Sequence, residues 1–236
     1  LPLVAHVARI KNKPYACDIE DILTGSDTES VSLMLSIERK FLPAAAVVST
    51  MSEVAAEYLD KQHALPHKVV PLHNCASAIE RTAVHPPSAN VPSLPSIYWF
   101  GQTLGPHSLA IELIQANALA GNRFRIVLRG QPARGYLEQI KEAARRAGSE
   151  TLVEVLPVID PSQMVSEAAK HDVLFGSQPS DQLFHQLAIG NKVFAGIFGG
   201  CALLLTDTIA HRRLADSLAG ACRLVTVDAH EIAREL

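Results

Sequence analysis

Short apolar runs alternate with longer amphipathic stretches along most of this chain. Runs such as Ile97–Phe100 and Ala202–Leu205 are short, apolar and bounded by polar or glycine residues, which predicts buried strands. In the stretch Ala133–Ala147, apolar residues recur every three or four positions, which predicts a helix. Strands that alternate with helices are typical of βαβ units, so the sequence predicts an α/β fold with parallel sheets.

The first part of the chain has fewer of these units. Its pattern predicts strands at Tyr15–Ile19, Ala44–Val48 and Lys68–Leu72, and helices at Thr28–Phe41 and from Ser49 or Thr50 to about Asp60. Ser49 or Thr50 is expected to cap the second helix, with Glu53 as the partner of Thr50 in a capping box. The opening residues, LPLVAHVARIKNKP, resemble the second half of a helix, so we expect a fragment truncated at both ends.

The second part of the chain shows a regular alternation of strands and helices. Its strands are expected at Ile97–Phe100, Phe124–Leu128, Leu152–Leu156, Val173–Phe175, Ala202–Leu205 and Arg223–Val227. Its helices are expected at Ser108–Ala120, Ala133–Ala147, Pro161–Lys170 and Asn191–Phe198, from Ile209, and at the end of the chain.

Between these parts, the proline-rich stretch RTAVHPPSANVPSLP has no periodicity and is expected to be a linker. The sequence therefore predicts a first domain at 1–78, a linker at 79–95 and a second domain at 96–236.

Composition excludes several classes of protein. The 236 residues are 48% hydrophobic and 19% charged, with a net charge of -3 and no clustered basic face, so we expect no nucleic-acid partner. No apolar run is long enough for a transmembrane helix. The four cysteines are widely spaced, and no signal peptide is visible at the first residue. These features favour a cytoplasmic location, and peripheral association with the inner membrane face stays open.

Candidate ligand-binding residues lie where the strands of the second part end, because the carboxyl ends of parallel strands form the usual ligand edge. Arg129 and Lys192 can neutralise a diphosphate there, although a solvated Arg129 and a Lys192 that only extends into solvent stay open as alternatives. The candidates are Gly101, Gln102, Arg129, Gly130, Gln131, Ser177 to Asp181, Asn191, Lys192, Thr206, Asp207 and Thr208.

Other catalytic and metal-binding patterns are absent or incomplete. There is no G-x-G-x-x-G, P-loop or G-x-S-x-G motif. The histidines of HALPHKVVPLHNC are good ligand types, but Pro66 interrupts the helix that would align His63 with His67, so we expect no metal site. Glu20 and Asp21 follow a strand and are the catalytic candidates, although such residues also cap helices or face solvent.

Several segments together resemble glycosyltransferases with the GT-B fold (the group 1, or family 4-like, enzymes). AAVVSTMSEVAAEYLDKQHALPHKVVPLHN is similar to the closing part of their acceptor domain. IYWFGQTLGPHSLAIELIQANAL resembles the opening of their donor domain, and NKVFAGIFGGCALLLTDT resembles their segment Asn-Lys-x-Phe, helix, Gly, strand, Ser/Thr-Asp. The resemblance extends over nearly the whole chain.

This resemblance implies two Rossmann-like domains, the N-terminal one incomplete, and a hexosyltransferase-like reaction. A nucleotide sugar would be the donor, with no cofactor and no metal, and the acceptor would be a carbohydrate, a lipid-linked sugar or a protein. The implied donor-binding residues are Gly101, Arg129, Gly130, Gln131, Asn191, Lys192, Thr206, Asp207 and Thr208. Strands upstream of Leu1 and helices downstream of Leu236 would be missing, and the fragment itself is expected to be inactive.

The chain departs from the family pattern at one motif. Many members have two glutamates separated by seven residues, and alignment on Gly200 places Leu187 and Ala195 at these positions. Two alternatives therefore stay open. One is a nucleotide-sugar epimerase of the same architecture, and the other is a catalytically degenerate binding protein with this fold.

Overall fold

The computed structural model describes residues 1–22, 30–81, 94–179, 182–218 and 220–236. Residue contacts divide the chain into two units. The N-terminal unit comprises Leu1–Asn74, Ser180–Ile189 and Thr208–Arg213, and the C-terminal unit comprises Cys75–Pro179, Gly190–Asp207 and Leu214–Leu236. Most of the expected linker lies outside the described residues, and the domain boundaries drawn from the sequence stay a prediction.

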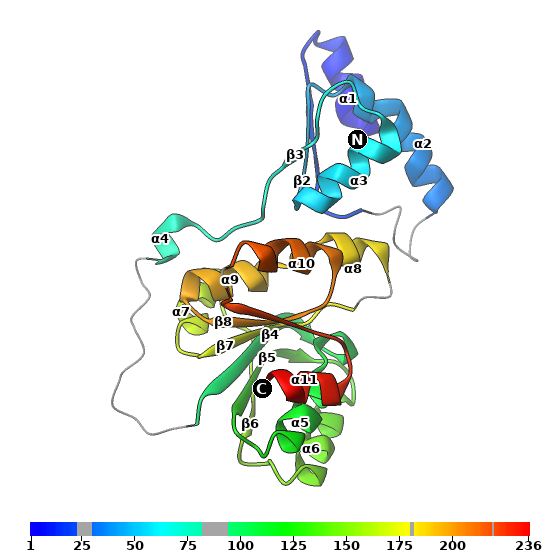
Figure 1. Ribbon diagram of the computed structural model, residues 1–236. Coiled ribbons are helices and arrows are strands. Elements are labelled where there is room, and N and C mark those ends of the chain that lie inside the picture. Colours follow the sequence, from blue (N-terminus) through cyan, green and yellow to red (C-terminus); the bar gives the residue numbers. More distant parts are fainter. Residues whose placement is uncertain (23–29, 82–93, 180–181, 219) are drawn as a thin grey trace. The chain divides into compact units, whose positions relative to one another are not determined.

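The N-terminal unit contains a three-stranded parallel sheet in the order β1-β2-β3 (Figure 1). Its strands are β1 (Ala16–Ile19), β2 (Val47–Thr50) and β3 (Val70–Pro71). Its helices are α1 (Pro2–Ile10), α2 (Val31–Phe41), the short 3-10 helix η2 (Leu42–Ala44), α3 (Glu53–His63), α8 (Leu183–Leu187) and the first part of α10 (Ile209–Asp216).

The start of α3 corrects the capping prediction. Ser49 and Thr50 end β2, where they pair with β3. The cap is Ser52, whose Oγ accepts a hydrogen bond of 3.1 Å from the backbone N–H of Ala55. Glu53 is therefore the first residue of the helix and cannot close the capping box that a cap at Thr50 would allow. The strand continued further than expected because Thr50 still has a parallel partner.

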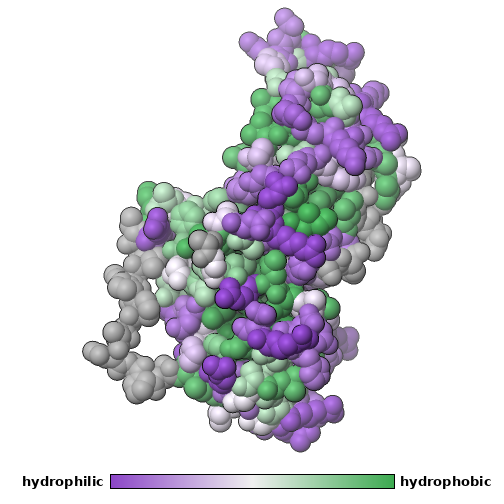
Figure 2. Space-filling model, in the orientation of Figure 1, coloured by the Kyte–Doolittle hydropathy of each residue, from purple (hydrophilic) through white to green (hydrophobic). Residues whose placement is uncertain are grey.

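The core of the N-terminal unit lies beneath α3, whose Val54, Ala55 and Leu59 are buried. Helix α1 has no buried residue, and its apolar side chains, Leu3 and Ile10 among them, are exposed. Figure 2 shows hydrophobic areas among hydrophilic ones over the region of α1 to α3. Helix α3 thus contributes more apolar burial to this unit than α1 does.

The C-terminal unit is built on a six-stranded parallel sheet in the order β6-β5-β4-β7-β8-β9 (Figure 1). Its strands are β4 (Ser96–Leu104), β5 (Arg125–Pro132), β6 (Val153–Leu156), β7 (Val173–Gly176), β8 (Ala202–Thr206) and β9 (Cys222–Val225). Its helices are α4 (Ala78–Arg81), α5 (Ala110–Leu119), α6 (Tyr136–Arg146), α7 (Met164–Ala168), α9 (Asn191–Gly199) and α11 (Ala229–Glu235), with the 3-10 helices η3 (Pro106–Ser108) and η4 (Pro161–Gln163).

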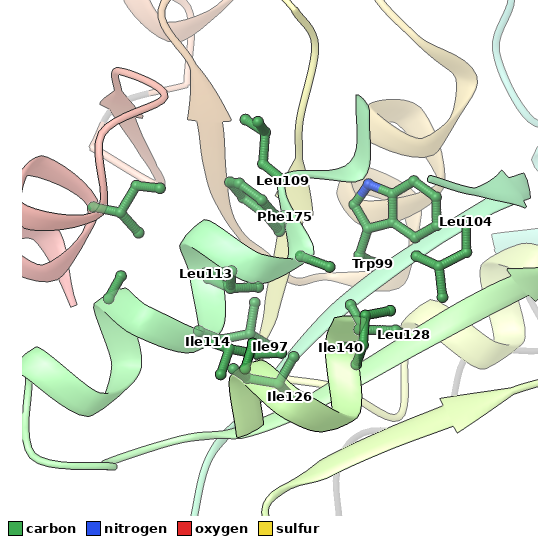
Figure 3. Packing of buried hydrophobic residues seen from close by; sticks show 14 of the residues in the cluster. Ile97, Trp99, Leu104, Leu109, Leu113, Ile114, Ile126, Leu128, Ile140 and Phe175 are labelled. Carbon is green, nitrogen blue, oxygen red and sulfur yellow. The ribbon is translucent and has the colours of Figure 1, made fainter. Parts of the chain in front are cut away.

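Helices pack on both faces of this sheet. Helix α5 contacts α6 and α11, while α7 contacts α9. Figure 3 shows the apolar layer beneath α5 and α6, in which Ile97 of β4 lies beside Leu113 and Ile114 of α5, and Trp99 of β4 lies beside Leu104. Each large side chain that is fully buried in such a layer contributes about 1.5–3 kcal/mol to stability.

The parallel α/β fold expected from the sequence is confirmed by both sheets. Two short helices were not expected: α4 overlaps the region assigned to the linker, and α8 lies in a segment for which the sequence predicted no element. In the described part of the chain, no helix combines the length and hydrophobicity that a membrane span requires.

Candidate functional site

The strand order of the C-terminal unit fixes where a ligand site is expected. The first strand in the chain, β4, lies in the middle of the sheet; β5 and β6 extend the sheet to one side, and β7, β8 and β9 extend it to the other. The order in which strands are added to the sheet therefore changes sides between β4 and β7, while all strands stay parallel. In open parallel sheets, ligands bind outside the carboxyl ends of the strands at this topological switch point.

An irregularity in β4 lies at this position. The pairing of β4 with β5 shifts between Phe100 and Thr103, so Gly101 and Gln102 fall at a bulge. Close packing requires glycine at Gly101 and at Gly130 on the neighbouring strand β5. A Cβ on Gly101 would lie 2.8 Å from Cη2 of Trp99, and a Cβ on Gly130 would lie 2.7 Å from the Gly101 carbonyl oxygen. Packing within the unit therefore explains why glycine occupies these two predicted donor-binding positions.

A hydrogen-bonded cluster joins the ends of β4 and β7. The indole Nε1 of Trp99 donates to Ser177 Oγ at 2.7 Å, and Ser177 Oγ donates to the His107 carbonyl oxygen at 3.1 Å. The rings of Trp99 and His107 have centroids 6.0 Å apart. Since Trp99 is fully buried and Ser177 nearly so, this cluster is a fixed part of the strand edge.

Lys192 joins this cluster from the first turn of α9. Its Nζ lies 4.4 Å from the centroid of the Trp99 ring, a cation–π arrangement. Among the described residues no carboxylate pairs with this ammonium group. Burial lowers the pKa of Lys192 to about 8. The pKa of His107 is also lowered, first by burial and then by the charge of Lys192. As far as the structure describes the chain, this cluster therefore contains a partly buried cation without a counter-charge.

Arg129 lies on β5, and its donors are used within the unit. Its Nε donates to Tyr98 Oη at 2.9 Å, its Nη1 donates to the Pro157 carbonyl oxygen at 2.8 Å, and its Nη2 forms an ion pair of 3.1 Å with Glu167. The side chain of Arg129 is only 10% exposed. This network differs from both readings of the sequence, a solvated charge and a diphosphate ligand, and the role of Arg129 in donor binding stays a prediction.

The remaining predicted donor residues of the C-terminal unit are distributed along its edge. Gln131 is exposed near the end of β5, and Asn191 is exposed as the first residue of α9. Thr206 is buried at the end of β8, where its Oγ1 accepts a hydrogen bond of 2.8 Å from the backbone N–H of Gln178. Asp207 follows it and is partly buried. Thr206 therefore connects the turns that follow β7 and β8.

Thr208 belongs to the N-terminal unit and is fully buried. Its Oγ1 accepts a hydrogen bond of 3.1 Å from the backbone N–H of His211, so it closes the first turn of α10. The two positions that correspond to the missing glutamates are buried, with Leu187 and Ala195 each 4% exposed. The described structure uses both positions for packing.

In the N-terminal unit, Glu20 and Asp21 are exposed just after β1 ends. The histidines that suggested a metal site have separate partners: His63 pairs with Glu38, His67 with the Ala45 carbonyl oxygen, and His73 with Glu53. Within the described ranges, no group of three His, Cys, Asp or Glu residues is placed to hold a metal ion. Sequence reasoning missed the pair of Glu53 and His73, because a pattern does not show which turns meet.

Comparison with known proteins supports the fold. No protein-family model matches the chain, and no curated protein matches its sequence. The structure of Anabaena Alr3699/HepE in complex with UDP is similar, with a TM-score of 0.74 and 17% identity over 99% of this chain and 64% of that chain. A glycosyltransferase from Rickettsia africae matches with a TM-score of 0.69 and 12% identity over 99% of this chain and 68% of that chain.

A third similar structure is sucrose-phosphate synthase from Thermosynechococcus elongatus, with a TM-score of 0.70 and 15% identity over 98% of this chain and 60% of that chain. These matches confirm, at the level of fold, the resemblance to GT-B glycosyltransferases that the sequence motifs indicate. The chain spans 64% of the length of HepE, so the activity of the whole protein is a matter for proposal.

Proposed function

We propose that this chain is the nucleotide-sugar-binding part, with some of the acceptor-binding part, of a glycosyltransferase. The observation that carries the proposal is Lys192, a partly buried cation at the switch point of a doubly wound sheet, for which the described residues provide no carboxylate partner. A buried ammonium group costs free energy unless an anion compensates it. A diphosphate is an anion of suitable charge, and the fold is one that glycosyltransferases share.

In this proposal the diphosphate binds beside Lys192 and the first turn of α9. The backbone N–H groups of Asn191 and Lys192, the first two residues of α9, have no partner within the helix, whereas Val193 N–H bonds the Gly190 carbonyl oxygen; the helix dipole favours negative charge at this end. Both features favour the departing diphosphate, whose negative charge grows as the bond to the sugar breaks. The other predicted donor residues on this edge, Gln131, Asn191 and Asp207, are then candidates for contacts with the rest of the nucleotide sugar.

UDP-sugars are the first donors to consider. Structures of HepE contain UDP, UDP with glucose, and UDP-glucose. The similar structures described above are glycosyltransferases or sugar-phosphate synthases, which favours transfer to an acceptor over epimerisation. The acceptor would bind the N-terminal unit, and a carbohydrate, a lipid-linked sugar and a protein all remain candidates.

A second candidate function is nucleotide binding without transfer. It is favoured by the burial of Leu187 and Ala195 at the positions where many family members have glutamates. Such a protein would keep the diphosphate site around Lys192 but would not cleave the donor. Binding and cleavage must therefore be measured separately.

Two measurements test the proposal. The first is a thermal-shift screen of the chain against UDP, GDP, ADP, CMP and their sugars, in which a ligand that binds the native state raises the melting temperature. The second is UDP release from UDP-glucose. We expect a shift with UDP. Release would show that the chain also cleaves the donor, although the chain spans only 64% of the length of HepE and is expected to be inactive by itself. No shift with any nucleotide in a folded sample would refute the proposal.

A further inference from the structure

A cavity lies in the N-terminal unit between α1 and the end of α2, two helices in contact with each other (Figure 1). Its volume is about 530 Å³, which falls within the roughly 300–1,000 Å³ of sites that hold small molecules. Tyr15 comes directly before β1 and Ala44 comes before β2, so the cavity lies at the amino edge of the sheet. The catalytic candidates Glu20 and Asp21 follow β1 at the opposite edge.

Hydrogen bonds fix the backbone around this cavity. Helix α1 ends in a Schellman motif, in which Asn12 has a φ of 48° and Lys13 N–H donates to the Ala8 carbonyl oxygen at 2.9 Å. This turn places Lys13 in the wall of the cavity. Tyr15 Oη donates a hydrogen bond to the Phe41 carbonyl oxygen, which ties the segment before β1 to the end of α2. The cavity is therefore built on a backbone that is held at both helices.

The cavity is lined by basic side chains from three elements. They are His6 and Arg9 of α1, Lys13 of the turn after it, and Lys40 of α2. Within the described ranges, no carboxylate lines the cavity, and none forms an ion pair with Arg9, Lys13 or Lys40. Residues 1–17 contain no Asp or Glu, and Glu38, the only acidic residue of α2, is buried against His63. The described part of the chain thus leaves these cations without a counter-charge.

Cations on the surface of the C-terminal unit are arranged differently. On α6, Lys141 pairs with Glu138, and both Arg145 and Arg146 pair with Glu142. Each of these cations has an acidic residue three or four positions earlier, the spacing that brings side chains together on a helix. Helix α1 has no acidic residue at any position. An anion from outside the chain would supply the charge that α1 lacks.

The rest of the cavity wall is apolar and partly aromatic. Tyr15 and Phe41 are half-buried, and Ala5 and Ala8 form the wall on the side of α1. Lys40 Nζ lies 5.4 Å from the centroid of the Phe41 ring, so the cationic and aromatic parts of the wall adjoin each other. A bare phosphate ion is much smaller than this cavity and would leave the apolar wall uncovered. A phosphate group on an aromatic body matches both parts.

We propose that this cavity binds a soluble aromatic phosphate. The ring of the ligand lies against Tyr15 and Phe41, and its phosphate lies beside Arg9, Lys13 and Lys40. Arginine binds phosphate through two parallel hydrogen bonds, and lysine binds it as a point charge. The inference does not depend on the proposed function, because the N-terminal unit alone builds this cavity and the C-terminal unit contains Lys192.

Fluorescence titration of the chain with 1-naphthyl phosphate tests the proposal. We expect saturable binding that 1-naphthol and inorganic phosphate do not reproduce at the same concentrations, because the site needs both the ring and the charge. Arg9→Gln and Lys40→Gln should each raise the Kd by about fivefold, since each removes one exposed charge pair with the phosphate.

Lys11→Gln and Arg39→Gln are the matched controls. Both residues are exposed and lie close in sequence to lining cations, but neither lines the cavity. Their Kd should equal that of the unsubstituted chain. If the controls weaken binding as much as Arg9→Gln and Lys40→Gln do, only net charge matters and the proposal is overturned.

Three other results would also overturn the proposal. One is the absence of saturable binding in a folded chain, which leaves the diphosphate site untouched if the chain still binds UDP. Another is loss of 1-naphthyl phosphate binding in Lys192→Met, since the probe would then occupy the diphosphate site. The third is sedimentation of the chain with vesicles of phosphatidylcholine and phosphatidic acid without binding of 1-naphthyl phosphate, which would indicate a lipid surface instead.

Discussion

Replacement of Lys192 by methionine tests the diphosphate site most sharply. Methionine keeps a long unbranched side chain over the Trp99 ring and removes only the ammonium group, whose Nζ lies 4.4 Å from the ring centroid. Because no described carboxylate pairs with Lys192, the substitution leaves no buried charge without its partner. The folded structure should therefore tolerate the change, and an effect on ligand binding can be read directly.

The size of the effect follows from the hydrogen bond that is lost. A hydrogen bond to a charged group contributes about 1.5–3 kcal/mol. Since about 1.4 kcal/mol corresponds to a tenfold change in affinity, Lys192→Met should weaken UDP binding by about 10- to 150-fold. Loss of the cation–π contact should cost about 0.5–2 kcal/mol of stability, partly offset because the buried charge no longer has to be desolvated.

Isothermal titration calorimetry with UDP measures this directly, with the melting temperature recorded for each variant. Lys141→Met is the matched control, since Lys141 is 61% exposed on α6 and pairs with Glu138. Its UDP affinity should equal that of the unsubstituted chain. An unchanged affinity for folded Lys192→Met would remove Lys192 from the site and with it the observation that carries the proposed function.

Four further outcomes are expected. UDP affinity should be highest below pH 8 and should fall as the pH rises above it, because burial lowers the pKa of Lys192 to about 8 and only the protonated amine attracts phosphate; a flat titration profile from pH 7 to 9.5 would contradict this. Arg129→Met should destabilise the fold by about 1.5–3 kcal/mol in denaturant titrations, since it removes the ion pair with Glu167, which keeps only Lys170, and the hydrogen bonds to Tyr98 and Pro157; a loss below about 0.5 kcal/mol would show that the network matters little. Gly130→Ala should lower the melting temperature, because the new Cβ would lie 2.7 Å from the Gly101 carbonyl oxygen, and an unchanged melting temperature would show that the strand edge can relax. Ser52→Ala should cost about 1–2 kcal/mol through loss of the α3 cap, measured by chemical unfolding, with Ser36→Ala on the exposed face of α2 as control.

Much of the fold follows from periodicity. The six strands of the C-terminal unit were expected within a few residues of their observed positions, because each is a short apolar run bounded by turn residues. Strand order could not be read in this way, since it depends on which strands pair. Short elements were missed for a related reason: α8 has only one buried residue, Leu187, so its pattern contains no apolar stripe to detect.

The candidate site was predictable as an edge of the sheet but not as a set of contacts. Lys192 was expected there, and the structure places it against Trp99. Arg129 was also expected at this edge; its side chain engages Tyr98 and Glu167, and its role in donor binding stays a prediction. Glu53 and His73 meet only because β2 and β3 pair, and no spacing in the sequence encodes that contact.

The central claim is that a nucleotide diphosphate binds at the switch point of the C-terminal sheet, and a crystal structure of the chain with UDP tests it most directly. We expect the diphosphate within hydrogen-bonding distance of Lys192 Nζ and of the first backbone N–H groups of α9. UDP bound at any other place in the chain, or no bound UDP at concentrations that saturate similar proteins, would contradict the claim.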